Sequence, residues 1–137
     1  MSNKLRVYIS HSIRGAKGAD ATHEDMAANN RKAIAFVTDL KARFQDEVEF
    51  YCPGEHDEFV LVGYELGILS ETQILAVDCK IIESRDMILA WAPDQHISNG
   101  MMIEVIDASM NGKQVVVVKD KLDAEAVIDA ALERKLR

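Results

Sequence analysis

The sequence predicts an α/β fold in which a parallel sheet lies between two layers of helices, and three observations lead to this prediction. Short apolar runs alternate along the chain with longer segments in which apolar residues recur every three or four positions. The chain has 137 residues, enough for one domain with a hydrophobic core and too few for two ordinary ones. One short run holds four consecutive valines, which is typical of a strand covered on both faces.

Four segments are predicted to be strands. In the first, Leu5, Val7 and Ile9 alternate with polar or amphipathic residues, which is the two-residue period of a strand. The second strand ends before Pro53 and the third before Pro93, because proline cannot donate to the hydrogen-bond ladder of a sheet. The expected strands cover residues 4–10, 48–52, 86–92 and 114–119.

Helices are expected between these strands and after the last one. Thr22 and Asp25 have the spacing of a capping box at the start of a long helix, and Asn111-Gly112 is a standard helix stop. The acidic segment 53–63 is predicted to be a mobile connection. The expected helices cover residues 23–44, 70–84, 100–111 and 123–136. Their expected buried residues include Ile34, Val37, Leu40 and Phe44 in the first and Val127, Ala131 and Leu132 in the last.

Strands that alternate with helices form a parallel sheet with helices on both faces. We therefore expect a single domain over residues 1–137, of the three-layer α/β class and of flavodoxin-like size. Such a fold supports many activities, so the function must be inferred from the residues of a site.

Composition narrows the classes of function. The net charge of −7 argues against binding a nucleic acid polymer, which needs a basic face, but it permits a small phosphorylated ligand. No apolar run approaches the length needed to cross a bilayer, and the amino-terminal residues do not resemble a signal peptide. We therefore expect a cytoplasmic protein without membrane contact.

The cysteines and the other metal-ligating residues indicate no cofactor. Cys52 and Cys79 lack the spacing of a metal site and are expected to be reduced, structural thiols. No cluster of metal ligands is evident elsewhere in the sequence. The prediction is a protein without a metal or an organic cofactor.

The stretch from Ser98 to Glu104 is the first candidate site. It follows the third strand and opens a helix, and ligands of open α/β sheets bind beyond the carboxyl ends of strands, against helix N-termini. A carboxylate at Glu104 would face that crevice. The simpler interpretation is an acid that complements the positive end of the helix dipole.

Two further groups converge on the same crevice in this topology. Ser12, Arg14 and Gly15 directly follow the first strand and offer hydroxyl, guanidinium and backbone donors suited to a phosphate, although such residues also occur in ordinary loops. Asp78 lies on the apolar stripe of a helix, where an unpaired carboxylate is costly to bury. Asp78 is either a structural acid with a nearby donor or a proton donor whose pKa burial raises.

Three motifs together resemble one enzyme family. The run Tyr8-Ile-Ser-His-Ser-Ile-Arg-Gly15 looks like the first-strand motif of the 2′-deoxynucleoside 5′-monophosphate N-glycosidases, which belong to the nucleoside 2-deoxyribosyltransferase superfamily. Asp78 looks like that superfamily's helix aspartate ahead of the third strand. Ser98-x-Gly100-x-x-x-Glu104 looks like its Asp/Ser-x-Gly-x-x-x-Glu motif, in which the glutamate is the nucleophile. The resemblance spans residues 5–119.

The resemblance implies hydrolysis of a (deoxy)nucleoside 5′-monophosphate to free base and (deoxy)ribose 5-phosphate, with no cofactor. Glu104 would attack the anomeric carbon, Asp78 would protonate or orient the base, and Tyr8 would line the sugar or base pocket. Transferases of free nucleosides have Asp where this chain has Ser98, and a neutral serine does not repel a phosphate dianion. The residues implied to hold the phosphate are Ser12, Ile13, Arg14, Gly15, Ser98 and Gly100.

The sequence departs from the family pattern at several positions. A small residue is common in the family where this chain has His11, and a second glycine is usual where it has Met102. Ile106 also replaces a residue that is often small. We expect His11 and Met102 to contact the base. A homodimer is implied by the resemblance, but the partner serine that reaches the phosphate in some relatives has no counterpart, because no serine follows Ser109.

Two other functions fit the same residues. One is a transferase that passes the sugar to a second base, which Ser98 disfavours. The other is a nucleotide-binding or sensing module without turnover. A phosphorylation-receiver domain shares the fold class, but Ser10-His11 stands where its metal site needs acidic residues at the end of the first strand.

Overall fold

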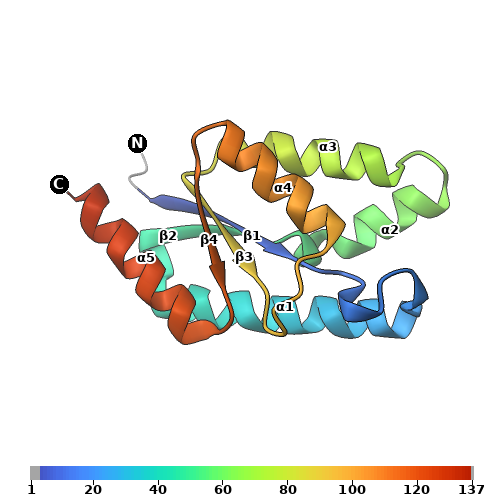
Figure 1. The fold of residues 1–137 in the computed structure, drawn as a ribbon, viewed down its shortest axis with the longest axis horizontal. Helices are drawn as coiled ribbons and strands as arrows, with labels where there is room; N and C mark the ends of the chain where they lie inside the picture. Colours follow the sequence, from blue (N-terminus) through green and yellow to red (C-terminus); the bar gives the residue numbers. More distant parts are fainter. Residues whose placement is uncertain (1–3, 137) are drawn as a thin grey trace.

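The computed structural model describes residues 4–136 and has the α/β architecture that the sequence predicts (Figure 1). Within this range, one sheet contains four strands in the order β2-β1-β3-β4. Each neighbouring pair is parallel. The strands are β1 (Leu5–His11), β2 (Val48–Tyr51), β3 (Met87–Trp91) and β4 (Gln114–Val118).

Helices cover both faces of this sheet (Figure 1). One face is covered by α1 (His23–Phe44) and α5 (Lys121–Lys135), and the other by α3 (Glu71–Ile82) and α4 (Asn99–Met110). A short helix, α2 (Asp57–Glu65), connects β2 with α3. The 3-10 turns are η1 (Gly15–Asp20), η2 (Gln45–Glu47) and η3 (Pro53–His56).

The alternation of side chains on β1 divides the core into two parts. Leu5, Val7 and Ile9 pack into a large cluster with buried residues of α1 and α5. Tyr8 points to the other face, into a smaller cluster with Ile82 of α3. The face under α3 and α4 therefore has fewer apolar side chains, which leaves positions for polar ones.

The expected start and buried face of the first long helix are confirmed. The Thr22 hydroxyl accepts from the Asp25 N–H at 3.0 Å, and the Asp25 side chain accepts from the Thr22 N–H at 3.0 Å. Val37, Leu40 and Phe44 are buried as expected, whereas Ile34 is half-buried and Ala33 and Phe36 are buried in its place. In α5 the buried residues are Ala124, Ile128 and Ala131, with Val127 and Leu132 packed at the margin of the core.

The prediction of a mobile connection over residues 53–63 is wrong, because η3 and α2 occupy that segment. Asp57 and Glu58 in the first turn of α2 complement the helix dipole. The apolar residues of this helix do not form a buried stripe: Phe59 is 79% exposed and Val62 is 48% exposed.

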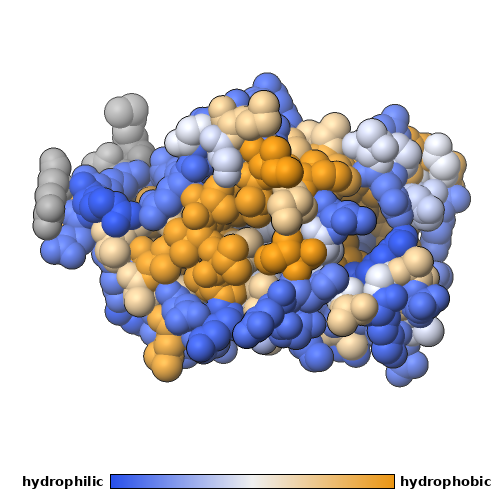
Figure 2. Space-filling model, viewed as in Figure 1, coloured by the Kyte–Doolittle hydropathy of each residue, from blue (hydrophilic) through white to orange (hydrophobic). Residues whose placement is uncertain are grey.

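The expectation that the valine-rich strand is buried on both faces is also wrong. β4 forms one edge of the sheet, and Val117 is 59% exposed. Figure 2 shows that apolar side chains gather over β4 and α4 on this side of the molecule. The exposed apolar residues of these two elements are Met102, Ile103, Ile106, Met110 and Val117, which we call the α4–β4 face.

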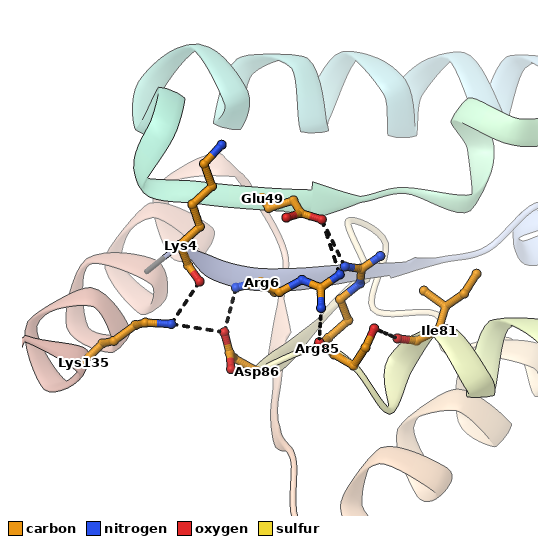
Figure 3. Close-up of polar contacts among 8 residues, drawn as sticks. Lys4, Arg6, Glu49, Ile81, Arg85, Asp86 and Lys135 are labelled. Carbon is orange, nitrogen blue, oxygen red and sulfur yellow. Dashed lines mark hydrogen bonds and ion pairs between the residues drawn. The ribbon is translucent and has the colours of Figure 1, made fainter. Parts of the chain in front are cut away.

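A polar network closes the amino-terminal end of the sheet (Figure 3). The Arg6 N–H donates to Asp86 Oδ2 at 2.8 Å, and the Arg6 and Arg85 guanidinium groups both approach Glu49 Oε1, at 3.5 and 3.2 Å. Lys135, at the end of α5, lies 3.6 Å from Asp86 Oδ2. These contacts lie at the opposite end of the strands from the edge where a ligand would bind.

No helix within residues 4–136 is both long and apolar enough to span a bilayer.

Candidate active site

A buried carboxylate, Glu104 of α4, is the centre of a polar cluster on the α3–α4 face of the sheet. Its side chain is only 4% exposed. The Tyr8 hydroxyl donates to Glu104 Oε2, and the Ser10 hydroxyl donates to Glu104 Oε1 at 2.8 Å. Asp78 of α3 interacts with both Glu104 and Tyr8. The structure thus brings together Glu104, Asp78 and Tyr8, three residues of the predicted site, and adds Ser10 to them.

Burial shifts the protonation of both carboxyl groups. Desolvation raises the pKa of Glu104 to about 7; the charge of Asp78 raises it as well, while the hydrogen bonds from Tyr8 and Ser10 oppose the shift. Desolvation also raises the pKa of Asp78 to about 6, against interactions with Glu104 and Tyr8. Two carboxyl groups that interact in this way titrate as a pair, so the cluster exchanges a proton near neutral pH.

Tyr8 remains a hydrogen-bond donor throughout this pH range. Burial, and then the charge of Glu104, raises the pKa of the Tyr8 phenol well above its ordinary value. Its ring is fully buried, so the hydroxyl has a fixed position relative to Glu104.

Local sequence explains why these side chains meet. Tyr8 and Ser10 lie two residues apart on β1 and therefore point to the same face. On α4, Met101, Glu104 and Ala108 form the buried stripe, with the three- and four-residue spacing of one helix face. The Ser98 hydroxyl begins this helix by accepting from the Met101 N–H at 3.2 Å.

The cluster lies at the topological switch point of the sheet. The chain leaves β1 towards β2 and leaves β3 towards β4, so the connections after β1 and β3 diverge. In sheets with this strand order, the crevice beyond the carboxyl ends of those two strands is where ligands bind.

A column of aromatic rings leads away from the cluster. Tyr8 stacks on Tyr51 of β2, with ring centroids 5.5 Å apart, and Tyr51 stacks on His56 of η3 at 4.9 Å. Tyr51 is half-buried and His56 is exposed, so the column runs from the interior to the surface. Arg85, in the turn between α3 and β3, lies over the Tyr51 ring at 5.4 Å.

Sequence reasoning missed Ser10, Tyr51 and His56. The two-residue alternation from Tyr8 was a sufficient signal for Ser10. The parallel register that places Tyr51 beside Tyr8 was not visible in the sequence, and His56 belongs to a segment predicted to be irregular.

The predicted phosphate-binding residues are divided between two nearby loops. The Ser12 hydroxyl accepts from the Gly15 N–H at 2.8 Å, which holds the first loop in a tight turn. Gly15 has φ +67°, a conformation that favours glycine, and a Cβ there would lie 2.9 Å from Asn29 Nδ2. Arg14 forms an exposed ion pair with Glu71 at 2.7 Å, at the start of α3.

The second loop carries Ser98 and Gly100 at the start of α4. A Cβ on Gly100 would meet Leu75 Cδ2 at an ordinary 3.6 Å, so packing within the protein does not demand glycine there. Ile13, in the first loop, is 39% exposed and its carbonyl accepts from Asn29 Nδ2 at 2.9 Å.

The two residues expected to contact the base lie apart from the acidic cluster. His11 follows Tyr8 and Ser10 by odd numbers of residues, so it points to the α1 face, where its Nε2 accepts from the Gly54 N–H at 3.0 Å. Burial lowers the pKa of His11. Met102 is 45% exposed and belongs to the α4–β4 face.

Neither cysteine shows signs of reactivity. Both are free, and burial raises the pKa of each thiol to about 11. Among residues 4–136, no group of three or more histidine, cysteine, aspartate or glutamate side chains has the arrangement of a metal site.

No protein-family model, curated protein or solved structure matches this chain, so the interpretation of the site depends on its geometry and on its motifs.

Proposed function

We propose that this protein is an N-glycosidase of the nucleoside 2-deoxyribosyltransferase type, which hydrolyses (deoxy)nucleoside 5′-monophosphates. One observation carries the proposal. The Glu104 carboxylate is buried, is held by the Tyr8 and Ser10 hydroxyls, and lies beside a second acid, Asp78, at the switch point of the sheet. Retaining glycosidases use one carboxyl group as the acid and a second carboxylate as the nucleophile.

The two carboxyl groups divide the chemistry. Glu104 in its ionised form attacks C1′ of the sugar, and the C1′–N bond breaks with its electron pair moving to the base. Asp78 in its protonated form gives its proton to the departing base. This reactive form is the minor one of the two singly protonated forms of the pair, because the pKa of Glu104, about 7, lies above that of Asp78, about 6. In the second step Asp78 takes a proton from water, the water oxygen attacks C1′, and the Glu104–C1′ bond breaks to release the sugar phosphate.

The hydrogen bonds of Glu104 suit both steps. Tyr8 and Ser10 hold its two oxygen atoms in place, so the nucleophile does not reorient before attack. These bonds also stabilise the carboxylate when it departs from the sugar, because a hydroxyl donor favours the charged form.

The 5′-phosphate is assigned to the two loops that contain Ser12, Arg14, Gly15 and Ser98. Backbone N–H groups at the start of α4 offer donors to an anion. Arg14 is available for this role, because its ion pair with Glu71 is exposed and such pairs contribute little to stability.

The base is assigned to the aromatic column. Tyr51 lies between Tyr8 and His56 in this column, so the outer face of the exposed His56 ring is the surface assigned to the base, because nucleobases bind to proteins by stacking on such rings. His11, which points to the α1 face, is not part of this assignment.

The homodimer is assigned to the α4–β4 face. Its exposed apolar residues come from a helix and an edge strand that lie side by side, and contiguous apolar surface of this kind marks protein interfaces (Figure 2). A second copy of the chain on this face would cover Val117, so that β4 would be buried on both faces, as expected of a valine-rich strand.

The proposal is tested by incubating the protein with a panel of ribo- and deoxyribonucleoside monophosphates and measuring release of the free base. Glu104→Gln is expected to reduce the rate by more than about a thousandfold, as expected for loss of a nucleophile. Glu47→Gln, an exposed glutamate of η2, is the matched control and is expected to keep full activity.

Two results would contradict the proposal. Full activity in Glu104→Gln would remove the assigned nucleophile. Tight binding of a nucleotide that stays intact during long incubation would indicate a binding module. A second free base added to the reaction separates hydrolysis from transfer, because only a transferase forms the exchanged nucleotide.

A further inference from the structure

A cavity lies on the opposite face of the sheet from Glu104. Its volume is about 600 Å³, within the range of small-molecule sites. It is bordered by α1, by the loop after β3 and by the junction of β4 with α5. The residues that matter for its chemistry are Asn29, Lys32, Trp91, His96, Lys119 and Lys121.

One stripe of α1 forms a wall of this cavity. Asn29, Lys32, Phe36 and Asp39 recur at three- and four-residue spacing and therefore lie on one face of the helix. Phe36 stacks on Trp91 of β3, with ring centroids 4.5 Å apart and planes inclined by 9°. The stacked pair provides a rigid apolar surface between the polar groups.

The cavity has ammonium groups without partners. Within residues 4–136, the Lys32 and Lys119 side chains form no ion pair or hydrogen bond, and Lys121 lies 3.8 Å from Glu125. Three carboxylates also border the cavity, those of Asp39, Asp94 and Asp120, equal in number to its lysines. Asp94 accepts from the His96 N–H at 3.1 Å, and Asp120 accepts from the Asp123 N–H at 2.9 Å.

We propose that this cavity binds a small phosphate ester, as a site adjacent to the one proposed for the nucleotide cleaved at Glu104, with which it shares Ser12 and Gly15. Lys32 and Lys119 would hold the phosphate from two sides, and the organic part would lie against Trp91. The carboxylates and the net charge of −7 oppose a larger polyanion. The proposal does not depend on the glycosidase activity.

The two sites share a structural element. Ser12 and Gly15, which belong to the proposed phosphate loop of the substrate, also border this cavity. Asn29 connects them, because its side chain donates to the Ile13 carbonyl at 2.9 Å. A ligand in the cavity that moves α1 or Asn29 therefore changes the affinity of the substrate loop, and by linkage the reverse holds.

Fluorescence tests the proposal, because Trp91 is the only tryptophan in the chain. Glycerol 3-phosphate is titrated into the protein and glycerol serves as the control without phosphate. We expect a saturable change with the phosphate ester alone. Lys32→Ala and Lys119→Ala should each weaken it about tenfold, the effect of losing one charge-assisted hydrogen bond. Lys80→Ala on α3, paired with Glu83, should leave it unchanged.

Backbone amide NMR spectra of the same titration locate the ligand. Shifts at Lys32, Lys119 and the Trp91 indole, retained in Arg14→Ala, support a second site. Shifts confined to Ser98 and Met101 would overturn the proposal, since the ester would then occupy the substrate site. A titration without saturation, or with an equal effect of Lys80→Ala, would overturn it too.

Discussion

Replacing Tyr8 with phenylalanine tests the electrostatic design of the cluster most directly. The substitution removes the hydroxyl that donates to Glu104 Oε2 and keeps the ring that stacks on Tyr51 at 5.5 Å. Ser10 still donates to the other oxygen at 2.8 Å. The change therefore removes the hydrogen bond from this hydroxyl to Glu104, together with the interaction of the same hydroxyl with Asp78.

The size of the effect follows from the type of bond. A hydrogen bond to a charged group contributes about 1.5–3 kcal/mol, and 1.36 kcal/mol corresponds to one pKa unit. The Tyr8 hydroxyl lowers the pKa of Glu104, which burial raises to about 7. Its removal should therefore raise that pKa further, by about one to two units. At neutral pH a smaller fraction of Glu104 is then ionised and able to attack the sugar.

The assay is the pH dependence of kcat/KM for base release. In Tyr8→Phe the acidic limb of the profile should move to higher pH by about one to two units, with a lower rate at neutral pH. Tyr51→Phe is the matched control: it removes a neighbouring phenol that donates no hydrogen bond to Glu104, and its acidic limb should stay in place. An unchanged acidic limb in Tyr8→Phe would refute the assigned role of the hydroxyl.

Three further substitutions have defined outcomes. The raised pKa of Glu104 means that the stability of the wild-type protein falls as pH rises from about 4.5 towards about 7, so Glu104→Gln should raise the free energy of unfolding above pH 7 by up to about 3 kcal/mol. Denaturant titrations at pH 5 and pH 8 measure this stabilisation, and an equal stabilisation at the two pH values would contradict the prediction. Arg14→Ala should raise KM for a nucleoside monophosphate about tenfold or more. It should change the free energy of unfolding by less than about 1 kcal/mol, since the ion pair of Arg14 with Glu71 is exposed, and an equal rise in KM for a free nucleoside would argue against a phosphate contact. Ile106→Glu should convert a dimer to a monomer in analytical ultracentrifugation, and a wild-type protein that is already monomeric would exclude the α4–β4 face as a dimer interface.

Period and capping signals were enough to predict most of the fold. All four predicted strands and all four predicted helices exist, with ends displaced by a few residues. The error at β4 has a different origin, because four valines specify a strand but not its place in the sheet. The helix α2 was missed although Phe59 and Val62 have helical spacing, because the acidic residues and the Pro53-Gly54 stop before it were interpreted as a connection.

The residues of the candidate site were predicted from their motifs. Their proximity was predicted from the rule that ligand sites lie at the carboxyl ends of parallel strands. Tyr8 and Glu104 are 96 positions apart and meet because one lies on the central strand and the other on the helix that covers it. The rule that ligands bind beyond the carboxyl ends of parallel strands correctly indicates that residues of β1 and α4 come together, but it does not indicate which face of the sheet a side chain lies on. His11 shows this limit: it belongs to the same motif as Tyr8, and its odd spacing places it among the residues of the opposite face.

The network at the amino-terminal end of the sheet also brings the two ends of the described chain together. The Lys135 ammonium group donates to the Lys4 carbonyl at 2.9 Å, so β1 begins where α5 finishes (Figure 3). A short peptide would join these ends and convert the domain into a ring. A label, a surface anchor or a fused protein attached at either end would project away from the carboxyl edge, leaving the approach to Glu104 unobstructed.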